Sequence, residues 1–155
     1  MLNYQGMIVI AHNIRSLHNV GSIFRSANAF GVEKLYLTGY TGAPPRKEIA
    51  KVSLKAEHTL PWESVEHVEG VVESLKNDGY TILALDNISG AESIDAVKPG
   101  DKLALILGNE VEGIDEPTRA LCDKIILIPT KGHKKSLNVS VATGVALFAL
   151  TSDSR

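Results

Sequence analysis

Five short apolar segments limit what this chain can fold into more than any other feature of its sequence. They are rich in Ile, Leu and Val and show little alternation between apolar and polar residues. Segments of this kind are typical of strands that are covered on both faces, as in a parallel sheet. We therefore expect buried parallel strands at residues 7–11, 35–37, 82–85, 103–107 and 125–128.

Helical patterns lie between these segments. The first predicted helix has an apolar face made of Val20, Ile23, Phe24 and Ala27. A second predicted helix starts near Val71 and ends near Asp78. Strands that alternate with helices predict the α/β class, with a parallel sheet flanked by helices. Because no repeat, low-complexity tract or linker interrupts the pattern, we expect a single domain over residues 1–155.

Composition narrows the classes of partner. A length of 155 residues suits one domain with a hydrophobic core. Because the net charge is −2, binding of nucleic acid would depend on a local basic patch. The single cysteine, Cys122, excludes an internal disulfide and a cysteine-based metal site, and it suits a reducing compartment. No apolar stretch reaches the length of a membrane span, and the N-terminus lacks the pattern of a secretion signal. These features predict a cytoplasmic protein with no membrane partner.

A polar cluster follows the first predicted strand. The helix that begins near Asn19 turns Asn19, Ser22 and Arg25 to its polar side, and Arg15 and His18 precede it. Arginine suits bidentate binding of phosphate. Alone, Arg25 could be a surface arginine and Asn19 a helix cap. Together with Arg15 they favour an anionic partner.

A second cluster, residues 108–114, follows the fourth predicted strand. Gly108 directly after a buried strand would let a ligand approach the backbone. The segment matches neither a phosphate-binding loop nor the dinucleotide fingerprint. Its carboxylates, Glu110 and Glu112, would repel phosphate and suit a cation or a hydroxyl-rich group. The plainer interpretation is a turn into a short helix that starts near Glu116.

The third cluster, residues 129–138, is the only basic stretch beside a predicted strand end. It carries Lys131, His133, Lys134 and Lys135, and Asn138 then caps a helix. Helix N-termini bind anions through free N–H groups. The alternative is a solvated loop.

The last segment, residues 138–150, is apolar nearly all round a helix. Such a helix must be buried on every side, so it lies either in the centre of the monomer or, as we favour, in a subunit interface. Lys47, Lys51 and Lys55 would form a basic stripe on another helix. We interpret that stripe as a solvated face rather than as a dedicated RNA contact.

The three clusters, in this order, resemble the three motifs of the SpoU (TrmH) family of SPOUT RNA 2′-O-ribose methyltransferases. The first motif is residues 19–27, Asn-Val-Gly-Ser-Ile-Phe-Arg-Ser-Ala. The second is residues 107–110, Leu-Gly-Asn-Glu, with Gly113. The third is Ile128-Pro129 with Gly132, followed by residues 136–142, Ser-Leu-Asn-Val-Ser-Val-Ala. The likeness covers nearly the whole chain, from about residue 13 onward.

The resemblance implies a parallel sheet whose C-terminal part forms a deep trefoil knot, and a homodimer with the active sites near the interface. It also implies S-adenosylmethionine as cofactor and a ribose 2′-hydroxyl of RNA as substrate, with tRNA expected first and rRNA as the alternative. Three other functions stay open: a non-catalytic RNA-binding module, a small-molecule enzyme and methylation of a base. The last is less expected because residues 136–138 look like the ribose branch.

The resemblance also implies roles for single residues. Gly108, Ile128 and Leu137 would line the cofactor pocket, and Ser136 and Asn138 would close it. Arg25 would be the main catalytic residue, in its own site or in the partner's, supported by Asn19, Glu110 and Asn138. The RNA contacts would be Arg15, His18, Arg25, Lys131, Lys134 and Lys135.

The chemistry of the reaction restricts these roles further. A sulfonium methyl group is already activated, so we expect no metal. Because a guanidinium keeps its proton, Arg25 suits a clamp on an RNA phosphate better than a general base. That phosphate, or Glu110, would then take the proton.

Overall fold

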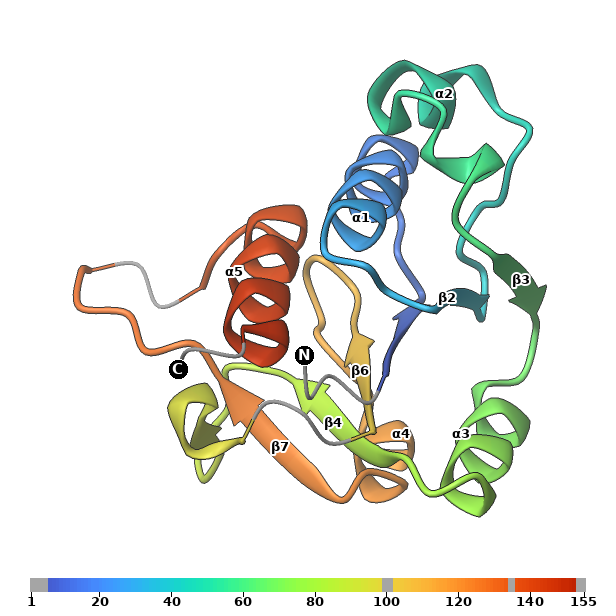
Figure 1. Cartoon of the computed structure of the whole chain (residues 1–155). Helices are drawn as coiled ribbons and strands as arrows, with labels where there is room; N and C mark the ends of the chain where they lie inside the picture. Colours follow the sequence, from blue (N-terminus) through green and yellow to red (C-terminus); the bar gives the residue numbers. More distant parts are fainter. Residues whose placement is uncertain (1–5, 99–101, 134–135, 153–155) are drawn as a thin grey trace.

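The computed structural model describes residues 6–98, 102–133 and 136–152 (Figure 1). Its strands are β1 (Met7–His12), β2 (Lys34–Thr38), β3 (Trp62–Val65), β4 (Thr81–Leu85), β5 (Glu92–Ser93), β6 (Leu103–Leu107) and β7 (Lys124–Leu127). They form a seven-stranded sheet in the order β3-β2-β1-β6-β4-β7-β5. Every strand pair in it is parallel. The predicted α/β class with a parallel sheet is confirmed.

All five predicted strands are present, with ends shifted by at most one residue. The two strands that the apolar pattern missed are both at the sheet edges. Two of the four residues of β3 are exposed, and β5 has only two residues, so neither leaves a continuous apolar segment. Short edge strands of this kind limit pairing with other chains.

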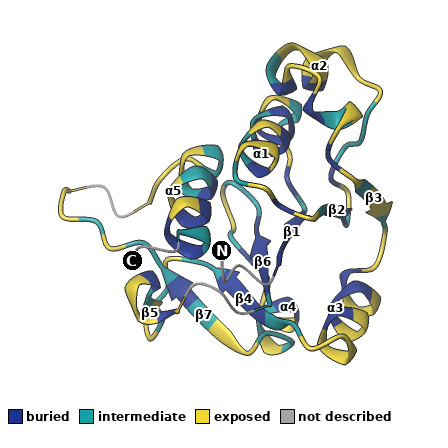
Figure 2. Cartoon of the chain, viewed as in Figure 1, coloured by how far each residue is buried: buried dark blue, intermediate teal, exposed yellow. Residues whose placement is uncertain are grey.

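Helices cover both faces of the sheet. They are α1 (Leu17–Ala29), α2 (Lys47–Ser53), α3 (Val68–Asn77), α4 (Glu116–Ala120) and α5 (Val139–Thr151), with short 3₁₀ turns η1 (Ala56–His58) and η2 (Ile94–Ala96). Side chains at alternate strand positions, such as Val9 and Leu105, join the core under α1 and α5. Their neighbours Ile8 and Ile106 join the core under α3. The central strands are consequently buried on both faces (Figure 2).

Helix α1 begins two residues earlier than the apolar pattern suggests, because Ser16 caps it. The Ser16 hydroxyl accepts the backbone N–H of Asn19 at 3.1 Å. Further along, α1 packs tightly on α2. A Cβ on Gly21 would lie 2.6 Å from the Ile49 carbonyl oxygen, so a larger residue there would push the helices apart.

The predicted basic stripe does not extend along one helix. Helix α2 ends at Ser53, and Leu54 and Lys55 both adopt left-handed backbone conformations. Lys47 and Lys51 share the helix, whereas Lys55 lies beyond its end. The spacing of the three lysines at every fourth residue gives no sign that the helix ends before Lys55.

The order of the strands places a topological switch point between β1 and β6. From β1 the chain continues to β2 and β3 on one side, while β6, β4, β7 and β5 lie on the other. In parallel α/β sheets, ligands collect at the carboxyl ends of strands beside such a switch point.

No helix within the described residues has the length and apolar character that a membrane crossing requires.

Candidate active site

A cavity of about 410 Å³ opens at the carboxyl ends of β4, β6 and β7, beside the start of α5. That volume is within the range of small-molecule sites. Of the five residues expected to hold a cofactor, four line it: Gly108, Ile128, Ser136 and Leu137. The fifth, Asn138, is not among the described lining residues. Its side-chain oxygen instead accepts the backbone N–H of Ser140 at 2.8 Å and so caps α5.

Gly108 is buried at the start of a tight turn that forms one wall of the cavity. The backbones of Asn109 and Gly113 pair across this turn, with N–H to oxygen bonds of 3.0 and 2.9 Å. A Cβ on Gly108 would lie 2.5 Å from Ile114 Cγ1 and 2.6 Å from the Gly113 carbonyl carbon. Glycine at position 108 is therefore needed for the turn itself.

Asp86, directly after β4, holds the far end of this turn. Its carboxylate accepts the backbone N–H of Ile114 at 3.2 Å and lies 3.6 Å from Arg119 Nη1. Asp86 also lines the cavity. Sequence reasoning missed this residue, although an aspartate directly after a buried strand is a usable signal.

Glu110 ties the second motif to the first. Its Oε1 accepts the backbone N–H of Arg15 at 2.8 Å. Its Oε2 accepts the backbone N–H of Ser16 at 2.8 Å and the side-chain amide of Asn19 at 2.9 Å. Asn19 is thus buried against Glu110 instead of facing solvent. The structure brings two predicted catalytic residues together and fixes the loop before α1 to the cavity wall.

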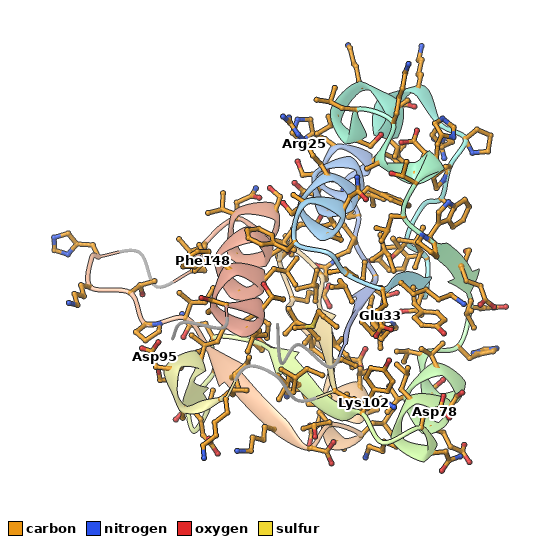
Figure 3. All side chains as sticks on the ribbon, in the orientation of Figure 1. Arg25, Glu33, Asp78, Asp95, Lys102 and Phe148 are labelled. Carbon is orange, nitrogen blue, oxygen red and sulfur yellow. The ribbon has the colours of Figure 1, made fainter. Side chains whose placement is uncertain are left out.

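Of the six residues expected to bind RNA, the four that the structure describes are exposed. Arg15 and His18 lie at the start of α1, and Lys131 lies in the loop after β7. Arg25 is also exposed, points away from the sheet in Figure 3 and is not among the described cavity residues. Lys134 and Lys135 lie outside the described residues. Among the described side chains, no group of three His, Cys, Asp or Glu residues is placed to hold a metal ion.

Comparison with known proteins identifies the family. The model of the SpoU rRNA methylase family matches residues 6–148. The chain belongs to this family. A tRNA (guanosine(18)-2′-O)-methyltransferase of Aquifex aeolicus is 35% identical over 149 residues, which are 92% of this chain and 67% of that enzyme. A 23S rRNA (guanosine-2′-O-)-methyltransferase of Vibrio vulnificus is 32% identical over 92% of this chain and 57% of its own length.

Solved structures agree with this SpoU assignment. The A. aeolicus TrmH/SpoU tRNA modifying enzyme aligns with a TM-score of 0.85 and 30% identity, over 96% of this chain and 76% of that one. The SpoU methyltransferase AviRb from Streptomyces viridochromogenes, in complex with AdoMet, aligns with a TM-score of 0.86 and 26% identity. That alignment covers 95% of this chain and 57% of AviRb. The SpoU-family chain thus spans between 57% and 76% of the lengths of the proteins named here.

The electrostatics of Glu110 limit its role in a SpoU site. Burial raises its pKa, but the hydrogen bonds from Arg15, Asn19 and Ser16 outweigh burial and hold the pKa below its ordinary value of 4.5. A carboxylate that already accepts three hydrogen bonds is a weak proton acceptor. Glu110 therefore fits the role of a positioning residue better than that of a base.

This hydrogen-bonded carboxylate should make stability depend on pH. Because the folded pKa is depressed, the stabilisation is fully present above the ordinary value and is lost as pH falls through the folded pKa. We expect Glu110→Gln to lower the melting temperature at about pH 6, and the difference from wild type to shrink toward about pH 3. Thermal unfolding across this range measures it.

The matched control is Glu112→Gln, since Glu112 is an exposed glutamate two residues further on. It should leave the melting curve nearly unchanged. If Glu110→Gln differed from wild type by the same amount at both pH values, the ionised carboxylate would not be the stabilising group.

Proposed function

We propose that this SpoU-family chain transfers a methyl group from S-adenosylmethionine to a ribose 2′-hydroxyl of RNA. The observation that carries the proposal is that Gly108, Ile128 and Leu137 line one cavity whose wall residue Glu110 is bonded to Asn19. The relatives named above act on tRNA and 23S rRNA at ribose 2′-oxygens. We propose tRNA as the substrate of this chain, with rRNA as the alternative.

The cavity suits this cofactor in size and in charge. Ile128 and Leu137 give it an apolar side, which fits an adenine ring. Three carboxylates line it, Asp86, Glu110 and Glu112, and no lysine or arginine is among its described lining residues. Negative groups favour a bound sulfonium cation. When bound, S-adenosylmethionine would supply a methyl group that needs no further activation.

The residues around the cavity would orient the reacting ribose. Glu110 and Asn19 hold the loop before α1 against the cavity wall, so that an RNA strand bound to this loop would lie over the methyl donor. Orientation of two reactants can lower a barrier by about 7–11 kcal/mol in favourable cases. Arg25 would clamp the phosphate beside the target ribose. Because the oxygens of Glu110 are occupied, the proton of the 2′-hydroxyl would go to that phosphate.

We also propose a homodimer in which Arg25 serves the partner's site. Val141, Val145 and Phe148 are exposed along one side of α5, and Phe148, labelled in Figure 3, is 61% exposed. An exposed apolar stripe on a helix with so few polar residues supports an interface. Arg25 lies outside the cavity of its own chain, which agrees with a role across that interface. Sedimentation that gave only monomers would reject this arrangement.

A knot in the C-terminal part of the chain is a further element of this proposal. We expect one methyltransferase domain over residues 1–155, with its C-terminal part threaded as a trefoil knot. The support is that β6 and β7 each lie beside β4, while α5 packs back against α1. We also propose a cytoplasmic location.

Cofactor binding separates this proposal from a non-catalytic RNA-binding module. A calorimetric titration with S-adenosylmethionine should show one site per protomer, and its product S-adenosylhomocysteine should compete. A chain that binds RNA without binding either compound would be the RNA-binding module instead.

RNA binding should weaken steeply with salt, because phosphates would be gripped by Arg15, His18, Arg25, Lys131, Lys134 and Lys135. Affinity measured by filter binding should fall by orders of magnitude between about 50 and about 200 mM salt. Lys131→Ala should reduce the slope of log affinity against log salt by about 0.7–0.9.

The control is Lys102→Ala, since Lys102 lies at the opposite end of β6 from Gly108 and donates to the Asp78 carbonyl oxygen (Figure 3). The slope of log affinity against log salt for Lys102→Ala should match that of wild type. A flat salt response of the wild-type protein would contradict this basic surface.

A further inference from the structure

A second hollow lies beside the proposed methyl-donor cavity, at the carboxyl ends of β1, β2 and β3. Its volume is about 530 Å³. Since β1 and β6 are neighbours in the sheet, both hollows open along the same edge. It is lined by His12, Asn13, Gly39, Tyr40, Glu66, His67, Val68 and Glu69.

Asn109 connects the two hollows. It lines the methyl-donor cavity, and its side-chain amide donates to the Tyr40 hydroxyl at 2.7 Å and to the Asn13 carbonyl oxygen at 3.1 Å. Its side-chain oxygen accepts the backbone N–H groups of Val111 and Glu112. All of these bonds fix the Tyr40 hydroxyl next to the turn that follows Gly108, while Tyr40 itself remains 62% exposed.

The wall of the second hollow contains unusual backbone geometry. Asn13 has a φ of 56°, which is uncommon for a residue other than glycine, and its side-chain oxygen accepts the backbone N–H of Tyr40 at 3.1 Å. A Cβ on Gly39 would overlap that oxygen. Such conformations persist only where the surroundings hold them, and they concentrate at functional sites. Here they hold Tyr40 in place.

The lining residues favour a base over a phosphate. Two carboxylates, Glu66 and Glu69, lie at the hollow, and no lysine or arginine is among its described lining residues. Carboxylates repel phosphate but accept hydrogen bonds from the N–H groups on the edge of a base. An exposed aromatic ring held in one orientation offers a face on which an unpaired RNA base can stack.

We propose that this hollow binds a nucleobase of the RNA that adjoins the target ribose, with the ring of Tyr40 stacked on it. This inference rests on the proposed function, since it takes the cavity at Gly108 as the methyl-donor site. It gives the enzyme a base subsite and a phosphate surface at different places: the acidic hollow at Tyr40 and the basic residues Arg15 and Arg25.

The base subsite can be tested without any methyl transfer. Guanosine, adenosine, cytidine and uridine 5′-monophosphates are added separately, at millimolar concentration, to the full chain while its backbone amides are followed by NMR. At least one should shift the amides of Gly39, Tyr40, Val68 and Glu69. Ribose 5-phosphate, which lacks a base, should not. Equal shifts with ribose 5-phosphate, or none with all four nucleotides, would overturn the proposal.

Tyr40 variants test the stacking in the reaction. Tyr40→Ala should raise KM for RNA about 10- to 100-fold while leaving the affinity for S-adenosylmethionine unchanged. Tyr40→Phe keeps the ring and should stay within a few-fold of wild type. Leu54→Ala, at another exposed apolar residue, is the matched control and should not change KM.

A merely structural role of Tyr40 would show itself differently. In that case Tyr40→Ala would have a lower melting temperature and a lower cofactor affinity, and its KM for RNA would rise no more than these two losses explain. That result would overturn the stacking role. A failure of methyl transfer with every RNA would instead reject the proposed function, because the NMR shifts do not depend on it.

Discussion

Replacing Gly108 with alanine should weaken S-adenosylmethionine binding by about 100-fold, or ~2.7 kcal/mol. The added methyl group would lie 2.6 Å from the Gly113 carbonyl carbon, so the backbone of the turn must move. That turn is a wall of the cavity, and moving it changes the shape that the cofactor would contact. The protein should still unfold cooperatively, with a loss of about 1–3 kcal/mol from overpacking. Calorimetry with S-adenosylmethionine and thermal unfolding measure the two effects.

Gly70→Ala is the matched control, because a Cβ on Gly70 of α3 would meet no atom within 4 Å. It should leave cofactor binding unchanged and stabilise the helix by about 0.5–1 kcal/mol. An unchanged titration heat for Gly108→Ala would mean that the cofactor binds elsewhere. Valine at position 108 should be worse than alanine, since its two further methyl groups add to the same clash.

Arg25→Ala should reduce turnover at saturating RNA by about 10²-fold, which is the cost that a misplaced reactant can have. Because Arg25 is assigned to the RNA phosphate and not to the cofactor, cofactor affinity should not change in the absence of RNA. Arg25→Lys keeps the charge but loses bidentate geometry, so its turnover should be intermediate. Single-turnover methyl transfer at saturating RNA measures these effects.

Arg46→Ala is the control for a lost surface arginine. Arg46 is exposed at the start of α2, and its side chain makes no capping hydrogen bond there. Its turnover should equal that of wild type. Near-normal turnover of Arg25→Ala at saturating RNA would rule out the phosphate clamp.

The buried strands and the position of Gly108 could be predicted from sequence because both depend on local patterns. A parallel strand covered on two faces is continuously apolar, as β1, β4 and β6 are. A glycine directly after such a strand marks a close approach of the backbone. The edge strands β3 and β5 lack this pattern and were missed.

The connections within the site could not be predicted because they join residues far apart in sequence. Glu110 and Asn19 are 91 positions apart, and Asn109 and Tyr40 are 69 apart. Each of these residues has an ordinary local explanation, such as a helix cap for Asn19. Only the sheet order, with β1 beside β6, brings the loop before α1 to the turn after Gly108.

The orientation of the Asn138 side chain is set by local hydrogen bonds. The sequence suggested two roles for it, a helix cap and a part of the cofactor pocket. In the structure its side-chain oxygen is committed to Ser140 at the start of α5. Its part in the cofactor site stays a prediction, and it would require the side chain to turn from Ser140 when ligand binds.

The central claim is methylation of a ribose 2′-oxygen, and one measurement tests it most directly. The protein is incubated with methyl-labelled S-adenosylmethionine and unmodified total RNA, which is then separated into tRNA and rRNA and digested to nucleosides. We predict label in 2′-O-methyl nucleosides of the tRNA fraction, and label in the rRNA fraction would instead select the alternative substrate. Label in base-methylated nucleosides, or none in either fraction beside an active control enzyme, would contradict the claim.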